Sequence, residues 1–346
     1  AKKYGYKVGA VGSSLITLYV KSDDNDKIVR LANDIEKQKN IPPEFMTNIL
    51  RIKARSLGYL GSYNDSYHEF KKAFIYAKEI SNNDVRHYRT SLLMENFTSY
   101  FENSQKHKDS ILYYQIKSLE EVSLVSDKSE NIPPILKYDC IIATNISIAY
   151  YYFNSDSRNL KMAEKHLLDA LKISEKNPCL LTTKLDLYDS FSDLYYFKND
   201  FPKAIEYANK TLKMEMKTKN PYIKENSYKI LSTAYLETNK KDSALYYQKK
   251  YLSISDSLKR AEKDTVSNQS EFLKDKEKET GKKTQMYIIL LALFVIFVII
   301  SLWKINYNIQ RNKYKKLITK IQDETNNTNN LLYKREKISL PLIMTH

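Results

Sequence analysis

Cysteines and histidines are the residues of this chain that could do chemistry by themselves. The two cysteines, Cys140 and Cys179, lack the Cys-x-x-Cys spacing of a zinc site. None of the five histidines stands four positions from another, as two metal ligands on one helical turn would. We therefore expect no metal centre and no cofactor. The cysteines would lie close together if they open neighbouring parallel helices, and a disulfide bond or two separate buried thiols are then the alternatives.

Motifs of known catalytic sites are absent from the sequence. It contains no Walker loop, no Gly-x-Ser-x-Gly, no His-Glu-x-x-His and no kinase motif set. The adjacent carboxylates Glu120 and Glu121 point in diverging directions on a helix, so they do not form a catalytic pair. We therefore expect that the protein is not an enzyme.

Composition restricts the fold that positions the remaining polar residues. The 346 residues include only 6 Gly and 8 Pro, too few for the turns of an all-β fold or for a Gly-rich nucleotide site. Hydrophobic residues make up 42% of the chain, with 29 Tyr and 12 Phe, which excludes global disorder. An all-α protein with a tyrosine-rich core is the prediction.

Two segments of the sequence match each other at an offset of 40 positions. Each begins with an aromatic residue, and an apolar residue and a small residue follow three and four positions after it. A second aromatic residue lies seven positions after the first, and another small residue lies sixteen positions after the first aromatic residue. This spacing predicts two antiparallel helices, with the small residue where they cross. The matching residues are Tyr188, Phe191, Ser192, Tyr195, Ala204, Ala208 and Thr211, and then Tyr228, Leu231, Ser232, Tyr235, Ala244, Gln248 and Tyr251.

Looser copies start near Leu50, Phe97 and Ile146, and a partial one covers residues 10–38. The pattern resembles the tetratricopeptide repeat (TPR), although no copy begins with Trp and the period exceeds that repeat's value of about 34. The resemblance implies an α-solenoid of five TPR-like helical hairpins over residues 25–257. An unrelated array of α-hairpins is the alternative, and it leaves the functional interpretation nearly unchanged.

In the TPR family, the concave face formed by the first helices usually holds an extended peptide or a partner helix. The resemblance therefore implies a protein or peptide ligand. The candidate binding residues lie between the packing positions of the first helices, where amides could hold a peptide backbone and arginines could meet acidic side chains. They are Arg51, Arg55, Asn96, Asn145, Asp189, Asp193, Lys229 and Thr233.

Residues 284–303 carry no charge and predict a single transmembrane helix. Tyr287 and Trp303 would form aromatic belts at its two ends, with lysines outside them. A charged helical stalk, residues 258–283, precedes the span, and a basic juxtamembrane tail, residues 304–346, follows it. The tail starts as a short amphipathic helix that we expect an asparagine cluster at 326–330 to break, and we expect the tail to contact anionic lipid rather than nucleic acid. Stalk and tail could also pair two copies into a homodimer.

The membrane orientation and the N-terminal segment leave alternatives. Lysines on both sides of the span slightly favour a cytoplasmic C-terminus and extracytoplasmic repeats in a bacterial inner membrane. Residues 1–24 are either the remnant of an export signal or the first helix of the array.

The order of repeats, stalk, span and basic helix resembles that of bacterial membrane-anchored TPR regulators. Those proteins continue into a cytoplasmic DNA-binding or kinase module, whereas only residues 304–346 follow the span here. The resemblance implies the sensory part of a transcriptional or signalling regulator. A structural scaffold or assembly factor of the cell envelope, without a signalling role, is the alternative.

Overall fold

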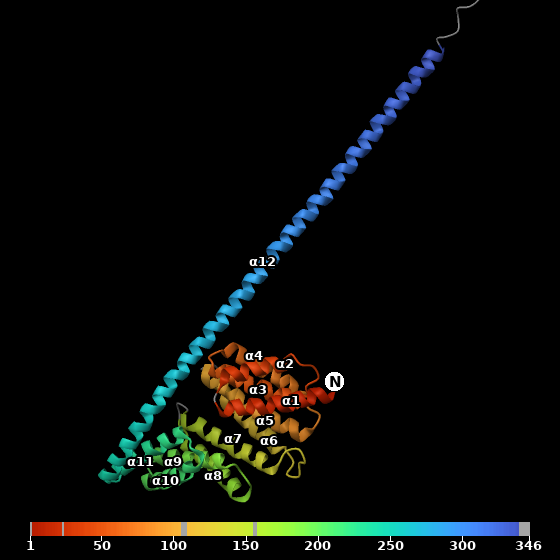
Figure 1. The fold of residues 1–346 in the computed structure, drawn as a ribbon. Helices are drawn as coiled ribbons and strands as arrows, with labels where there is room; N and C mark the ends of the chain where they lie inside the picture. The colour runs from red at the N-terminus through yellow and green to blue at the C-terminus, as the bar shows by residue number, and fades with distance from the viewer. Residues whose placement is uncertain (1, 23, 105–108, 155–157, 339–346) are drawn as a thin grey trace, which may run out of the picture. The chain divides into compact units, whose positions relative to one another are not determined.

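The computed structural model describes residues 2–22, 24–104, 109–154 and 158–338 (Figure 1). Every regular element in these ranges is an α-helix. The helices are α1 (Lys2–Lys21), α2 (Asn25–Glu36), α3 (Pro43–Tyr59), α4 (Tyr63–Lys78), α5 (Asn83–Ser104), α6 (Asp109–Ser123), α7 (Pro134–Asn154), α8 (Leu160–Lys176), α9 (Leu181–Phe197), α10 (Phe201–Thr218), α11 (Pro221–Glu237) and α12 (Lys241–Ile338).

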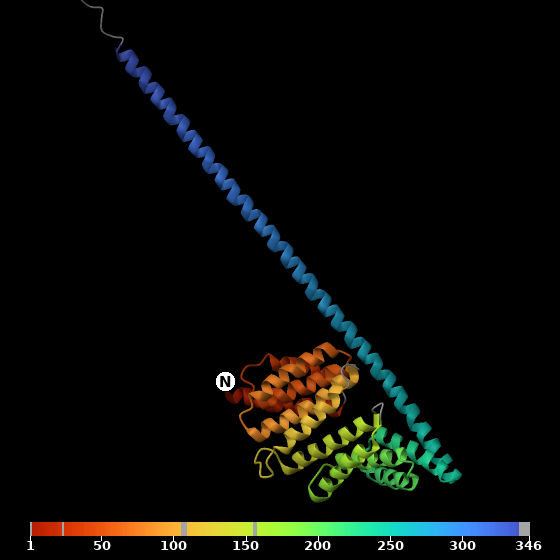
Figure 2. The ribbon, with the colours of Figure 1, turned by 180° about the vertical axis from the view of Figure 1, so that it is seen from behind.

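Consecutive helices pack as antiparallel pairs, α3 with α4, α5 with α6 and so on, and the pairs follow one another in chain order (Figures 1 and 2). The odd-numbered helices from α1 to α11 also contact one another in sequence, most weakly between α5 and α7. They therefore form one continuous layer, which we call the inner wall. The chain divides into two compact units. The first, Ala1–Lys274, contains all the helical pairs, and the second is Asp275–His346. The protein is thus an all-α repeat protein with solenoid-like packing.

The turn inside a pair repeats along the chain. Asn199 and Asn239 adopt φ values of 58° and 59°, in the left-handed region that asparagine tolerates better than most residues. After each of them the next backbone N–H returns to a tyrosine carbonyl, Asp200 to Tyr195 and Lys240 to Tyr235, both at 2.9 Å. In α3–α4 the corresponding turn has Gly61 at φ 78°.

Aromatic stacking inside a pair also repeats at the offset of 40. The rings of Tyr195 and Tyr207 stack with centroids 5.5 Å apart, and those of Tyr235 and Tyr247 with centroids 5.6 Å apart. The small residue that the sequence places at the helix crossing, Ala204, is fully buried. The two matched segments therefore fold as equivalent helical pairs, as their spacing predicts.

Helix α1 packs against the helices that follow it. Ile16 of α1 is fully buried in the core that α1 to α6 share. Gly5 permits a close approach of α1 to the loop before α3, because a Cβ there would stand 1.9 Å from the carbonyl oxygen of Asn40. Helix α1 is thus packed into the repeat unit.

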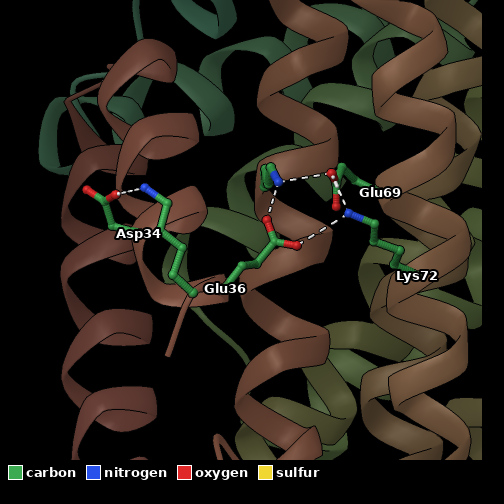
Figure 3. Close-up of polar contacts among 6 residues, drawn as sticks. Asp34, Glu36, Glu69 and Lys72 are labelled. Carbon is green, nitrogen blue, oxygen red and sulfur yellow. Dashed lines mark hydrogen bonds and ion pairs between the residues drawn. The ribbon is translucent and has the colours of Figure 1, made fainter. Parts of the chain in front are cut away.

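A buried ion-pair network joins α2, α3 and α4 (Figure 3). The ammonium of Lys53 contacts Glu36 and lies 2.9 Å from Glu69, and Lys72 lies 3.1 Å from Glu69 and 3.4 Å from Glu36. Two ammonium groups thus face two carboxylates, so the charges that folding buries are paired here.

The last helix, α12, begins as the second helix of the α11–α12 pair and runs without interruption to Ile338. The stalk, the apolar segment and the beginning of the tail are therefore parts of one helix, and the asparagines at 326–330 do not end it. Within the described residues one helical segment, Gln269–Asn329, is long and apolar enough to cross a membrane. Its most apolar stretch has a mean hydropathy of 2.9 and no buried residue. A single candidate span is thus present.

Candidate functional site on the inner wall

A chain of side-chain hydrogen bonds links α1, α3 and α5, the first three helices of the inner wall. The amide of Asn48 on α3 donates to the hydroxyl of Ser13 on α1 over 2.8 Å, and its carbonyl oxygen accepts from Nη2 of Arg51 over 2.7 Å. Nη1 of Arg51 donates to Oδ1 of Asn96 on α5 over 2.6 Å. Two of the sequence-predicted residues, Arg51 and Asn96, are therefore in direct contact and have a fixed orientation.

Arg51 belongs to a cluster of three arginines, which we call the arginine cluster: Arg51 and Arg55 on α3 and Arg89 on α5. The Nε atom of each is buried without a hydrogen-bond partner. Burial, and then the charges of Arg89 and Arg55, lower the pKa of Arg51 to about 9. This value lies above neutrality, so Arg51 stays a cation within the electrostatic influence of Arg89 and Arg55.

Two carboxylates lie close together further along the inner wall. Asp189 and Asp193, one turn apart on α9, both accept from the side-chain amide of Asn226 on α11, at 3.2 Å and 3.1 Å. The hydroxyl of Tyr150 on α7 donates to Asp193 over 3.4 Å. Burial, and then the neighbouring Asp193, raise the pKa of Asp189 well above its usual value, and burial raises the pKa of Asp193 to about 6. The structure thus brings these two predicted residues together as an acidic pair.

A third buried carboxylate bridges the weakest contact of the wall, between α5 and α7. Oε1 of Glu95 accepts from the hydroxyl of Ser147, and Oε2 is buried without a partner. Burial raises the pKa of Glu95 to about 7. The inner wall therefore carries arginines on α3 and in the first half of α5, and carboxyl groups with raised pKa values from Glu95 onward.

The other predicted residues lie outside these clusters. Asn145 is buried inside its own pair, where it donates to the carbonyl of Ile141 over 2.9 Å and its Oδ1 lies 2.9 Å from Nδ1 of His166 on α8. Lys229 is exposed near Asp193, whose pKa its charge lowers slightly. Thr233 donates to the carbonyl of Lys229 over 3.2 Å and lines a shallow pocket with Arg158. Asn145 is thus already engaged, whereas Lys229 is accessible.

Sequence reasoning missed several polar residues that complete the clusters, namely Asn48, Arg89, Glu95, Tyr150 and Asn226. A signal for one of them was present. Arg89 precedes Asn96 by two helical turns, so the two share a face of α5. The others depend on which helices become neighbours.

The cysteines are both free thiols. Cys140 is buried, with its sulfur 3.4 Å from the hydroxyl of Ser91, and Cys179 is half-buried. Burial raises the pKa of Cys140 to about 11. In the described part of the chain, no three or more His, Cys, Asp and Glu residues come together as metal ligands could.

The fold and this wall define a TPR-like helical repeat scaffold. Among solved structures, the chain is similar to BtubC (BKLC) from P. vanneervenii, with 12% sequence identity, a TM-score of 0.51, and coverage of 68% of this chain and 90% of that chain. At this identity the likeness shows the fold alone. No known protein-family profile matches the chain, and no curated protein sequence matches it.

Proposed function

We propose that this chain is a membrane-anchored protein-binding module whose inner wall holds an extended segment of a partner protein. The observation that carries the proposal is the state of the polar groups on the wall. The Nε atoms of Arg51, Arg55 and Arg89 and the Oε2 atom of Glu95 are buried without a partner. The residues that carry these atoms are half-buried, so the rest of each charged group is within reach of a bound peptide. Charged groups withdrawn from water usually cost free energy unless a partner satisfies them.

The arrangement of the wall also suits a peptide. Donors and acceptors follow one another from α1 to α11, and repeat arrays commonly use such a surface for an extended chain. Exposed Lys229 could contact the same segment.

Site-specific photocrosslinking in intact cells tests this function. A photoreactive amino acid is placed on the inner wall, at Arg55 or Lys229, or on second helices, at Ile75 of α4 or Met216 of α10, which are 60% and 70% exposed. We expect discrete adducts with a partner protein from the inner-wall positions only. Equal adducts from both sets, or none from the inner wall, would refute the function.

A finer proposal is that the module is the sensory part of a bacterial regulator, with extracytoplasmic repeats, a single inner-membrane span and a cytoplasmic C-terminus. The uninterrupted course of α12 from the α11–α12 pair into the candidate span supports it, because occupancy of the wall could then change a helix that enters the membrane. A scaffold of the cell envelope remains the alternative. A protease added to intact cells in which only the outer membrane is permeabilised should digest the repeats and leave the tail intact, and digestion of the tail instead would reverse the orientation.

A further inference from the structure

The arginine cluster differs from the two buried lysines, Lys53 and Lys137, in its partners. Lys53 contacts two carboxylates, and Lys137 lies 2.5 Å from Asp127. Within the described ranges, no ion pair involves Arg51, Arg55 or Arg89. Arg51, Arg55 and Arg89 are half-buried with a buried Nε atom each, and Arg55 and Arg89 both act electrostatically on Arg51. Charges withdrawn from water are normally paired, so these guanidinium groups without a carboxylate are a site that lacks its counter-charge.

The cluster is held in place without being neutralised. Asn48 and Asn96 accept from the two Nη atoms of Arg51. The guanidinium carbon of Arg55 lies 5.8 Å from the ring of Tyr59, and that of Arg89 lies 6.0 Å from the ring of Tyr88. These contacts restrict the side chains but contribute no negative charge, so the guanidinium groups are oriented in advance for an anion.

The surrounding charges narrow the class of anion. Glu44 is close enough to influence Arg89 electrostatically but forms no ion pair with it. Further along the wall, Glu95, Asp189 and Asp193 offer no positive charge to a polyanion such as a nucleic acid lying along the helices. A peptide can place a carboxylate at one end and neutral or basic residues at the other. Guanidinium groups also match carboxylates geometrically through paired N–H···O bonds.

We propose that Arg51, Arg55 and Arg89 bind the carboxylates of an acidic peptide segment, whose remaining part runs toward Asp189 and Asp193. This inference rests on the proposed function and names the chemistry of the partner segment.

Fluorescence anisotropy on the full chain in neutral detergent tests the inference, with labelled hexaglutamate as the probe and hexaglutamine as the uncharged reference. We expect hexaglutamate to bind more tightly than hexaglutamine, and binding to weaken as salt rises. The Arg55→Gln/Arg89→Gln double variant should weaken binding about tenfold or more, because charged hydrogen bonds are lost. Arg86→Gln is the matched control on α5, since Arg86 already donates to the Ile80 carbonyl and to Asn83.

The thermal midpoint of the free protein shows whether the cluster serves the fold or a ligand. Because Arg55 and Arg89 make no described hydrogen bond and repel Arg51, their replacement should leave the midpoint unchanged or raise it. A lower midpoint would mean that the arginines stabilise the fold, and would overturn the proposal. Equal binding of the two peptides, unchanged binding by the double variant, or tighter binding of a single-stranded oligonucleotide would overturn it too. Partner adducts from Lys229 without hexaglutamate binding would refute this inference while leaving the proposed function intact.

Discussion

The side-chain amide of Gln269 on α12 donates a hydrogen bond to the backbone carbonyl of Tyr59 at the end of α3, 210 residues earlier. Next to it, Phe272 packs against a small apolar cluster of Val29, Leu57 and Leu60. The first part of α12 thus belongs to the α11–α12 pair, through the stacked rings of Tyr235 and Tyr247, and also contacts α2 and α3. The last helix of the array therefore contacts its first helical pairs.

Replacing Phe272 with Ala should loosen this contact. Loss of a partly buried ring removes about 1 kcal/mol or more of apolar burial, and hydrogen exchange should become faster at residues 57–62 and 269–273. Leu252→Ala is the control on the same helix, since Leu252 is 52% exposed. Unchanged exchange in the Phe272 variant would show that the contact does not persist in solution.

Gly5→Ala should destabilise the repeat unit. The new Cβ would stand 1.9 Å from the Asn40 carbonyl oxygen, so α1 must move away from the loop before α3, at a cost of about 1–3 kcal/mol. Gly281→Ala in α12 is the matched control, because no atom lies within 4 Å of a Cβ there, and helix propensity favours Ala. Thermal unfolding in detergent measures both variants. A Gly5→Ala midpoint equal to that of the parent would contradict the packing of α1.

The acidic pair should make stability depend on pH. The folded protein holds protons on Asp189 and Asp193 at pH values where the unfolded chain has lost them, because their pKa values are raised in the folded state. The stability that these groups contribute is therefore present below the usual carboxyl pKa of about 3.9 and is lost as pH rises through about 6.

Thermal unfolding of Asp189→Asn against the parent measures this effect. The variant should gain stability relative to the parent as pH rises from about 4.5 to 7, since an amide does not ionise. Asp34→Asn, on the exposed side of α2, controls for the loss of one negative charge. If the stability difference between Asp189→Asn and the parent stays constant with pH, then Asp189 and Asp193 have the same pKa values in the folded and the unfolded protein.

The two free thiols should differ in reactivity. Burial raises the pKa of Cys140 to about 11, whereas Cys179 is half-buried, so a maleimide should label Cys179 first and Cys140 only after denaturation. Mass spectrometry of digested protein quantifies each site. Recovery of the two cysteine peptides joined to each other would instead establish the disulfide bond that their positions in the sequence allow.

Deletion of Tyr287 to Trp303 should release the protein from membranes. This segment supplies the most apolar part of the candidate span, and its side chains have no protein partner to bury them. Fractionation after an alkaline wash measures the effect, and deletion of residues 322–338 is a control of the same length. Retention of the first variant in the membrane pellet would show that another part of the chain anchors it.

The sequence by itself determined the features that arise within one helix or one pair. Tyr195 and Tyr235 stand at the seventh position of their repeats, so each faces its partner helix wherever the pair lies. The uncharged segment 284–303 indicates a span because length and hydropathy are local quantities. Only the tertiary structure decided that Arg89 joins Arg51 and Arg55, and that Gln269 reaches Tyr59. Helical periodicity specifies the face of a residue, but which faces meet depends on the rotation between successive pairs. That rotation is set by the packing of many side chains together.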